Sequence, residues 1–198
     1  ECDSGVVITA SHNPKEYNGY KAYWNDGAQV VAPHDKNIIA EVQKITSPDQ
    51  VLTNGHKDNI VILDETFDAI YLDAVHSLSL SPEAIAAHHD LKIVYTPIHG
   101  TGVILVPESL RKFGFTNVVT VKEQNIPDGN FPTVASPNPE ERATMKMAID
   151  LAARQQAEIV LATDPDADRI GMALRDRDGS YILLNGNQTC ALLVYYIV

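Results

Sequence analysis

Three aspartates at alternate positions, Asp164, Asp166 and Asp168, are the residues of this sequence best suited to chemistry. Like charges this close repel one another, so they are tolerated mainly when solvent or a bound cation neutralises them. Arg169 follows directly, and an arginine there is a natural donor to a phosphate oxygen held on the same cation. The loop therefore predicts a metal site that acts on a phosphate. A polar loop at the end of a strand is the plainer alternative.

The spacing of the aspartates also narrows the choice of metal. A calcium-binding EF-hand loop begins with the same alternation, but it requires glycine at the sixth position and glutamate at the twelfth. Those positions hold Arg169 and Arg175 here. A few carboxylates on a loop suit magnesium, which keeps water or substrate phosphate in its shell. Mg²⁺ is the expected metal.

Ser11 is the second candidate. The apolar run from Gly5 to Thr9 predicts a strand, and Ala10-Ser-His-Asn-Pro14 after it predicts a tight exposed loop that presents the Ser11 hydroxyl. A hydrolase nucleophile elbow would need glycine two residues before and after the serine, and neither is present. Lys21 lies on the next expected strand, residues 17–24, close enough in sequence to fold back beside Ser11.

The elements that must position the aspartates repeat regularly. Strands are expected at 91–96, 117–122 and 158–163, with helices at 103–113 and from a cap at Asn138 to about residue 152. This β-α-β-α-β order predicts a parallel sheet, at whose carboxyl edge ligands gather. The loop 96–102, which carries His99, and the loop 164–169 should both lie at that edge. A hairpin is expected at 170–184 and another helix from about residue 187.

The first half of the chain gives weaker signals. A helix is expected over 35–45, and a strongly amphipathic helix over 67–78 should bury its apolar stripe in the core. Ser81 should cap a further helix. Together the two halves indicate an α/β fold, with mixed and parallel sheets and flanking helices.

Composition excludes several classes of function. The 198 residues include 26 acidic and 15 basic ones, a formal net charge of −11, so a nucleic-acid partner is disfavoured. No apolar run is long enough to span a membrane. Cys2 and Cys190 show neither metal spacing nor a disulfide framework, which favours a reducing, cytoplasmic location. The abrupt start and a final helix that stops in mid-pattern suggest a fragment.

Two motifs together closely resemble the α-D-phosphohexomutase superfamily: Thr9-Ala-Ser-His-Asn-Pro14 with Tyr17-Asn-Gly-Tyr-Lys21, and Asp164-Pro-Asp-Ala-Asp-Arg169. Within it, Thr96-Pro-Ile-His-Gly-Thr-Gly102 and Pro127-Asp-Gly-Asn-Phe-Pro132 look most like bacterial phosphoglucomutases of the phosphoglucomutase/phosphomannomutase group. The resemblance covers nearly the whole chain and implies repeated α/β/α domains.

The resemblance implies a role for each candidate residue. Ser11 would carry the exchanged phosphoryl group, and Mg²⁺ would be held by Ser11 together with the three aspartates. Lys21 would be the general acid/base, Arg169 would contact the phosphate, and three more residues would line the phosphate site, namely His12, Asn13 and His99.

The implied reaction interconverts hexose 1-phosphate and hexose 6-phosphate through a bound 1,6-bisphosphate, with glucose favoured over mannose and glucose 1,6-bisphosphate as the activating intermediate. The family has four domains. By resemblance, residues 1–80 would be the later part of domain I, 81–184 domain II and 185–198 the start of domain III. Domains III and IV would then be missing, and we expect the fragment alone to be inactive.

Two alternatives remain at this point. A haloacid-dehalogenase-type phosphotransferase also places Asp-x-Asp after an apolar strand, but it uses the first aspartate, here Asp164, as nucleophile. That aspartate normally lies near the start of its domain, whereas Asp164 follows the third strand of the repeat. A non-catalytic module that binds metal or phosphate is the other alternative. Phosphate mapping, metal titration and an activity assay separate the three.

Overall fold

The computed structural model describes residues 2–55 and 57–198 and divides into two compact units. One contains the residues up to Thr9 and Asn18–Asp64, and the other contains Ala10–Tyr17 and Glu65–Val198. The eight residues around Ser11, called here the serine loop, therefore belong with the later part of the chain. Among the described residues, no helix is both long and apolar enough to cross a membrane.

The first unit is built on a β-hairpin. Strands β1 (Ser4–Ile8) and β2 (Tyr20–Trp24) pair antiparallel, with Val7 opposite Lys21. Helix α1 (His34–Val42) follows, with short 3-10 turns at Pro48–Gln50 and Lys57–Asn59. The strands and the helix were expected from the sequence.

The second unit contains a five-stranded mixed sheet in the order β4-β3-β5-β6-β7. Its strands are β3 (Ile93–Thr96), β4 (Val118–Thr120), β5 (Ile159–Thr163), β6 (Ile170–Arg175) and β7 (Tyr181–Leu184). The first three run parallel, and β6 and β7 form an antiparallel hairpin beside β5. This confirms the expected β-α-β-α-β arrangement. It also places the loops after β3 and β5 at one edge, because these two strands are neighbours.

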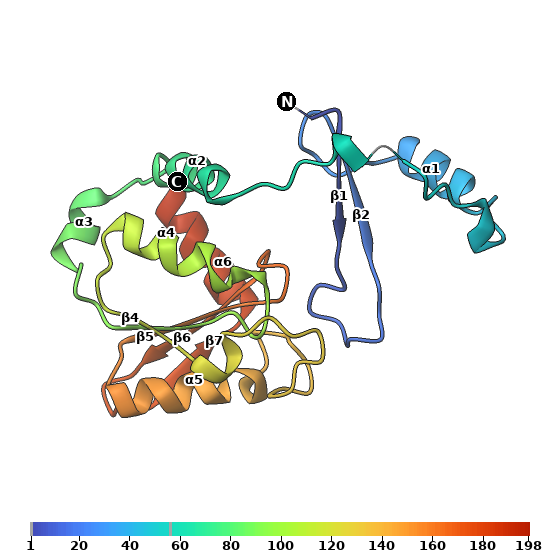
Figure 1. The fold of residues 1–198 in the computed structure, drawn as a ribbon. Coiled ribbons are helices and arrows are strands. Elements are labelled where there is room, and N and C mark those ends of the chain that lie inside the picture. Colours follow the sequence, from blue (N-terminus) through green and yellow to red (C-terminus); the bar gives the residue numbers. More distant parts are fainter. Residues whose placement is uncertain (1, 56) are drawn as a thin grey trace. The chain divides into compact units, whose positions relative to one another are not determined.

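Helices cover both faces of this sheet. Helix α5 (Arg142–Gln155) lies on one face and α4 (Leu105–Phe113) on the other (Figure 1). The core between sheet and α5 includes Val94, Val160 and Met145, all fully buried. Helix α4 ends at Gly114, whose φ of 108° allows the left-handed cap that the sequence predicted. The last helix, α6 (Gly186–Ile197), begins with Asn185 in a capping box.

Helix α2 (Glu65–His76) is less buried than its pattern predicted. It packs on α4 through an ion pair between Asp73 and Lys112 of 2.5 Å and a ring contact between His76 and Phe113. Leu72 is its one buried residue, whereas Ile70 is 65% exposed. The expectation that the whole stripe is core was therefore wrong, because α2 meets its neighbour along a narrow seam.

Two predicted helix caps were also wrong. Helix α3 (Pro82–Ala87) begins after Ser81, but the Ser81 side chain makes no capping hydrogen bond. Helix α5 begins at Arg142, not at Asn138. The Asn138 side chain instead accepts the backbone N–H of Glu140 at 3.1 Å, and this local turn delays the helix. Asparagine favours turns and helix caps for the same physical reason, so the sequence pattern did not separate them.

Candidate active site

The acidic loop, Asp164–Arg169, follows the buried end of β5 directly. It closes as a turn in which the Ala167 N–H donates to the carbonyl oxygen of Asp164 at 3.0 Å, and Ala167 has a φ of 60°. One carboxylate oxygen from each of Asp164, Asp166 and Asp168 lies within 4.8 Å of the others. The backbone turn thus brings together three carboxylates that alternate along the chain.

Asp164 is fully buried, and its surroundings make a negative charge costly. Burial, followed by the neighbouring Asp166 side chain, raises the pKa of Asp164 to about 6. Its two oxygens accept from the Arg169 backbone N–H at 3.0 Å and from the Ser11 hydroxyl at 3.1 Å. Three clustered carboxylates, one of them buried, are a donor set that fits a hard divalent cation, because the cation would offset both burial and repulsion.

The serine loop places Ser11 against this cluster. Ser11 Oγ donates to Asp164 Oδ2 at 3.1 Å, and the two residues are 153 positions apart in the sequence. His12 Nδ1 lies 3.2 Å from the same Oγ. Ser11 has a φ of 53°, and the Asn13 N–H donates to the Ala10 carbonyl oxygen at 3.1 Å. A tight turn therefore presents the hydroxyl, as the sequence suggested.

Two other candidates, Lys21 and Arg169, belong to different parts of the fold. Lys21 lies on β2 in the other compact unit, opposite Val7. The Arg169 side chain is exposed, and the hydrogen bond described for this residue comes from its backbone.

A third loop, Thr96–Gly102, packs directly on the acidic loop. A Cβ added at Gly100 would lie 2.5 Å from Pro165 Cα and 2.7 Å from the Pro165 carbonyl oxygen. Thr101 donates to that oxygen with its N–H at 2.9 Å and its hydroxyl at 3.0 Å. This segment, called here the histidine loop, therefore fixes the second residue of the acidic loop, and glycine is required for the close approach.

The His99 side chain contacts residues of the long loop that follows β4, not the acidic loop. It is 4% exposed, and its ring nitrogens lie 2.9 Å from the Ile126 carbonyl oxygen and 2.9 Å from Thr133 Oγ1. Gln124, fully buried, donates to the same hydroxyl at 3.0 Å. Sequence reasoning did not single out Gln124 or Thr133. Both are common surface residue types, and the one available signal was that they belong to an unusually long loop, Gln124–Asn138.

Left-handed backbone conformations gather in these loops. Six described residues other than glycine have a positive φ, and only Gln156, at the end of α5, lies outside the loops described above. The others are Ser11, Ile98, His99, Phe131 and Ala167. Such conformations are strained for most side chains and often mark functional sites.

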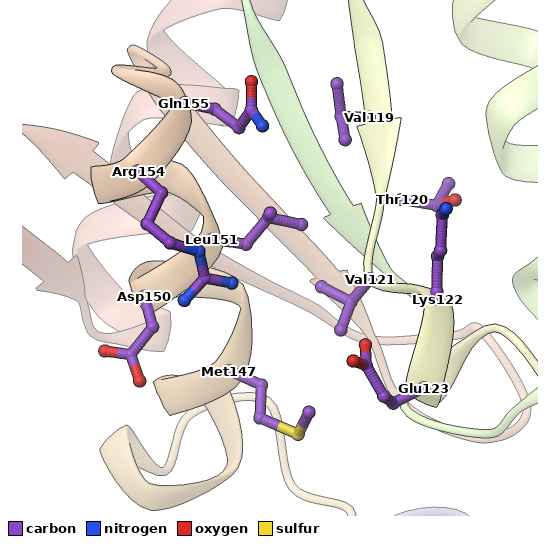
Figure 2. Close-up of a pocket in the computed structure, with 10 residues that line it drawn as sticks. All are labelled: Val119, Thr120, Val121, Lys122, Glu123, Met147, Asp150, Leu151, Arg154 and Gln155. Atoms are coloured by element: carbon purple, nitrogen blue, oxygen red, sulfur yellow. The ribbon is translucent and has the colours of Figure 1, made fainter.

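A separate groove of about 460 Å³ lies between β4 and α5 (Figure 2). Its lining includes Val121 and Lys122 from the strand side and Met147 and Arg154 from the helix. None of its lining residues belongs to the serine, histidine or acidic loops.

Comparison with protein families gives two matches. The model described as phosphoglucomutase/phosphomannomutase, alpha/beta/alpha domain II, matches residues 69–179, more than half of the chain. The model for domain I of the same family matches residues 1–49.

Individual relatives agree with these matches. A probable phosphomannomutase of Haemophilus influenzae is 40% identical over 198 residues, which cover 98% of this chain and 39% of the relative. A Staphylococcus aureus phosphoglucomutase is 37% identical over 193 residues, covering 98% and 35%. The crystal structure of a putative phosphomannomutase from Thermus thermophilus shares the fold, with a TM-score of 0.78 at 24% identity, covering 98% of this chain and 40% of that one. The chain spans well under half the length of these relatives and belongs to the phosphoglucomutase/phosphomannomutase family.

Proposed function

We propose that this chain carries the phosphoserine and metal-binding parts of a phosphohexomutase, which interconverts hexose 1-phosphate and hexose 6-phosphate. The observation that supports this most directly is the 3.1 Å hydrogen bond from Ser11 Oγ to Asp164 Oδ2, which joins a hydroxyl nucleophile to a carboxylate cluster. Together they offer a phosphoryl acceptor and the ligands for a cation that would neutralise phosphate charge at a phosphoryl-transfer site.

In this proposal Asp164, Asp166 and Asp168 hold Mg²⁺, with an oxygen at Ser11 as a further ligand. The metal supplies charge stabilisation for the transferring phosphoryl group. The Arg169 guanidinium contacts the same phosphate, and His12 and Asn13 shape the serine loop.

The transfer step breaks the bond between phosphorus and Ser11 Oγ and forms one to a hydroxyl oxygen of the sugar monophosphate, which gives a 1,6-bisphosphate. The sugar hydroxyl loses its proton to a base, for which we propose Lys21. The reverse transfer, from the other end of the reoriented bisphosphate, restores phosphorylated Ser11. We propose glucose phosphates as the main substrates and glucose 1,6-bisphosphate as the activating intermediate.

We further propose that the active protein is longer than this chain. The relatives named above are phosphomannomutase and phosphoglucomutase chains of which it spans 39% and 35%. On this proposal residues 1–80 belong to domain I, 81–184 to domain II and 185–198 to domain III, and the rest of domain III and domain IV complete the substrate site. A protein that contains these residues and the further domains is called here the extended protein. We place it in a reducing, cytoplasmic compartment, since both cysteines are free.

The test is the site of phosphorylation. Incubating the extended protein with glucose 1,6-bisphosphate and Mg²⁺ should add one phosphate, which peptide mapping places on Ser11. The Ser11→Ala variant should neither take up phosphate nor turn over glucose 1-phosphate. Phosphate mapped to Asp164 instead would show a haloacid-dehalogenase-type mechanism and overturn the proposal.

The role of Lys21 has its own test. Lys21→Met keeps the length of the side chain but removes the amine that would accept and return the sugar hydroxyl proton, so turnover of the extended protein should fall by about a hundredfold or more. Phosphorylated Ser11 should remain detectable by mass, since metal and phosphate contacts are intact. Lys36→Met, on α1, serves as the matched control. Unchanged turnover in Lys21→Met would remove the assigned role.

A further inference from the structure

Four polar side chains from two loops form a continuous chain of hydrogen bonds inside the second unit. Thr96 Oγ1 donates to Gln124 Oε1 at 2.7 Å, and Gln124 Nε2 donates to Thr133 Oγ1 at 3.0 Å. Thr133 Oγ1 lies 2.9 Å from His99 Nε2. The first two residues are fully buried and His99 nearly so. We call these four residues the relay. Polar groups buried this deeply are retained only when each one is paired.

The proton positions in the relay are determined by its ends. The Ile126 carbonyl can only accept, so His99 Nδ1, 2.9 Å away, carries a proton and donates it. A neutral His99 then accepts at Nε2 from the Thr133 hydroxyl, whose oxygen accepts from the Gln124 amide. Reversing the amide would leave the Thr96 hydroxyl without its acceptor and would require a second proton on His99. The neutral Nδ1–H form is the arrangement that satisfies every member.

The relay holds a strained backbone in place. Ile98 and His99 have φ values of 48° and 60°, and a left-handed conformation is especially unfavourable for a β-branched side chain. Ile98 N–H donates to Thr96 Oγ1 at 3.1 Å, and His99 N–H donates to the Gln124 carbonyl oxygen at 2.9 Å. Strain of this kind persists only where the surroundings impose it. Here the partners that impose it are members of the relay.

The strained residues are followed at once by those that touch the acidic loop. Gly100 packs on Pro165, and Thr101 donates to the Pro165 carbonyl oxygen twice. On its other side, the long loop reaches the serine loop through a contact of 3.4 Å between Asn130 Oδ1 and Lys15 Nζ. The relay is thus joined through Gly100 and Thr101 to Pro165, which directly follows the aspartate that accepts the Ser11 hydroxyl.

We propose that His99, Gln124 and Thr133 are positioning residues that hold the acidic loop against Ser11. They lie behind the site and touch none of the reacting atoms. In this proposal His99 supports the site from behind instead of lining the phosphate site, because both ring nitrogens have partners within the protein. The kinetic part of the proposal rests on the proposed function, whereas the state of His99 rests on the geometry alone.

The kinetic test uses substitutions at Thr133. Thr133→Val keeps the shape but removes the oxygen that joins Gln124 to His99, so kcat of the extended protein should fall on the order of tenfold to a hundredfold through misplacement of the acidic loop. Thr133→Ser restores the hydroxyl and should return kcat to within about twofold of the parent protein. Thr144→Val is the matched control, since Thr144 is also buried and donates its hydroxyl to the Ser136 carbonyl at 2.7 Å outside the relay.

Spectroscopy tests the relay without any substitution. Long-range ¹H–¹⁵N correlation spectra of the 198-residue chain at neutral pH should show His99 with a protonated Nδ1 and an unprotonated Nε2. The amide protons of Thr101 and Asp128 should exchange slowly, because the first donates to Pro165 and the second to the His99 carbonyl oxygen at 3.1 Å. In Thr133→Val both amides should exchange faster.

The hydrogen-bond arrangement of the relay and its positioning role are contradicted by different results. An Nε2–H or doubly protonated His99 overturns the relay whatever the enzyme does. Equal kcat in Thr133→Val and the parent protein, or an equal loss in Thr144→Val, overturns the positioning role. A parent protein that neither phosphorylates Ser11 nor turns over substrate refutes the proposed function instead, and the spectra still decide the relay.

Discussion

Asp164 is the residue at which stability and the proposed chemistry conflict. It is fully buried beside Asp166, and its pKa is raised to about 6. At pH 7 the folded, metal-free chain therefore holds a buried negative charge that water would solvate at little cost if the chain unfolded. Asp164→Asn removes that charge while its amide oxygen still accepts the Arg169 N–H. We expect the free energy of unfolding of the metal-free variant to exceed that of the metal-free parent chain by about 1 to 2 kcal/mol. Urea denaturation in the presence of a chelator measures this difference.

Asp178 provides the opposite case for comparison. It is exposed, and hydrogen bonds from Ser180 hold the pKa of its carboxyl below the ordinary value. Asp178→Asn should therefore lower stability slightly instead of raising it. If both substitutions shift the denaturation midpoint in the same direction, the burial argument for Asp164 is wrong.

Tyr95 supplies a prediction at alkaline pH. Burial raises the pKa of its phenol to about 12, while the hydrogen bond with Thr163 at 2.8 Å opposes the shift. Between about pH 10 and 12 the unfolded chain releases this proton and the folded chain keeps it. The free energy of unfolding should therefore fall by about 2 to 3 kcal/mol across that range.

Tyr95→Phe isolates this contribution, since phenylalanine does not titrate. The variant should be less stable by about 1 kcal/mol at neutral pH through the lost hydrogen bond, and the difference from the parent chain should shrink and then reverse as pH rises through 11. A difference that stays constant from pH 9 to 12 would contradict the assignment.

At the scale of elements, the fit between the histidine loop and the acidic loop depends on Gly100. A Cβ there would approach the backbone of Pro165 to 2.5 Å, and backbone cannot move aside as a flexible side chain does. We expect Gly100→Ala to cost about 1 to 3 kcal/mol of stability and to weaken Mg²⁺ binding, as measured by calorimetry. Gly129→Ala is the control, because nothing lies within 4 Å of its added Cβ.

Sequence patterns predicted the strands and helices of the second unit well, since buried β-branched runs such as Ile159–Thr163 and a glycine cap such as Gly114 carry strong local signals. These patterns did not predict the contacts between segments that are distant in sequence. The start of α5 was misplaced, because a turn and a helix cap attract the same residue types. The roles of Gln124 and Thr133 were missed, because nothing local shows that a polar side chain is buried by a loop distant in sequence.

The pairing of Ser11 with the aspartates was expected from the family resemblance, not from spacing, because no local pattern links residues 153 positions apart. The backbone conformation of Ala167 and Ser11 could not be predicted from the sequence either. Each adopts a left-handed backbone without glycine, a choice made by tertiary contacts that override local preference.

For the whole molecule, the arrangement predicts that metal binding and folding are linked. A cation held by the three carboxylates binds the folded chain only, so it should raise the free energy of unfolding by about 2.7 kcal/mol at a hundredfold excess over its dissociation constant. Thermal unfolding of the 198-residue chain with and without MgCl₂, at matched ionic strength, measures this. Asp164→Asn should abolish the increase, and an increase that survives in this variant would place the metal elsewhere.

The compact unit that contains the acidic loop also contains the eight residues around Ser11, which are separated in sequence from the rest of that unit by Asn18–Asp64 of the first unit. During synthesis Ser11 leaves the ribosome well before Asp164, by roughly 8 to 30 s at ordinary elongation rates. The Ser11 hydroxyl therefore cannot form its hydrogen bond with Asp164 until that later residue has been synthesised. The serine loop is therefore made well before the acidic loop that supplies its native contact.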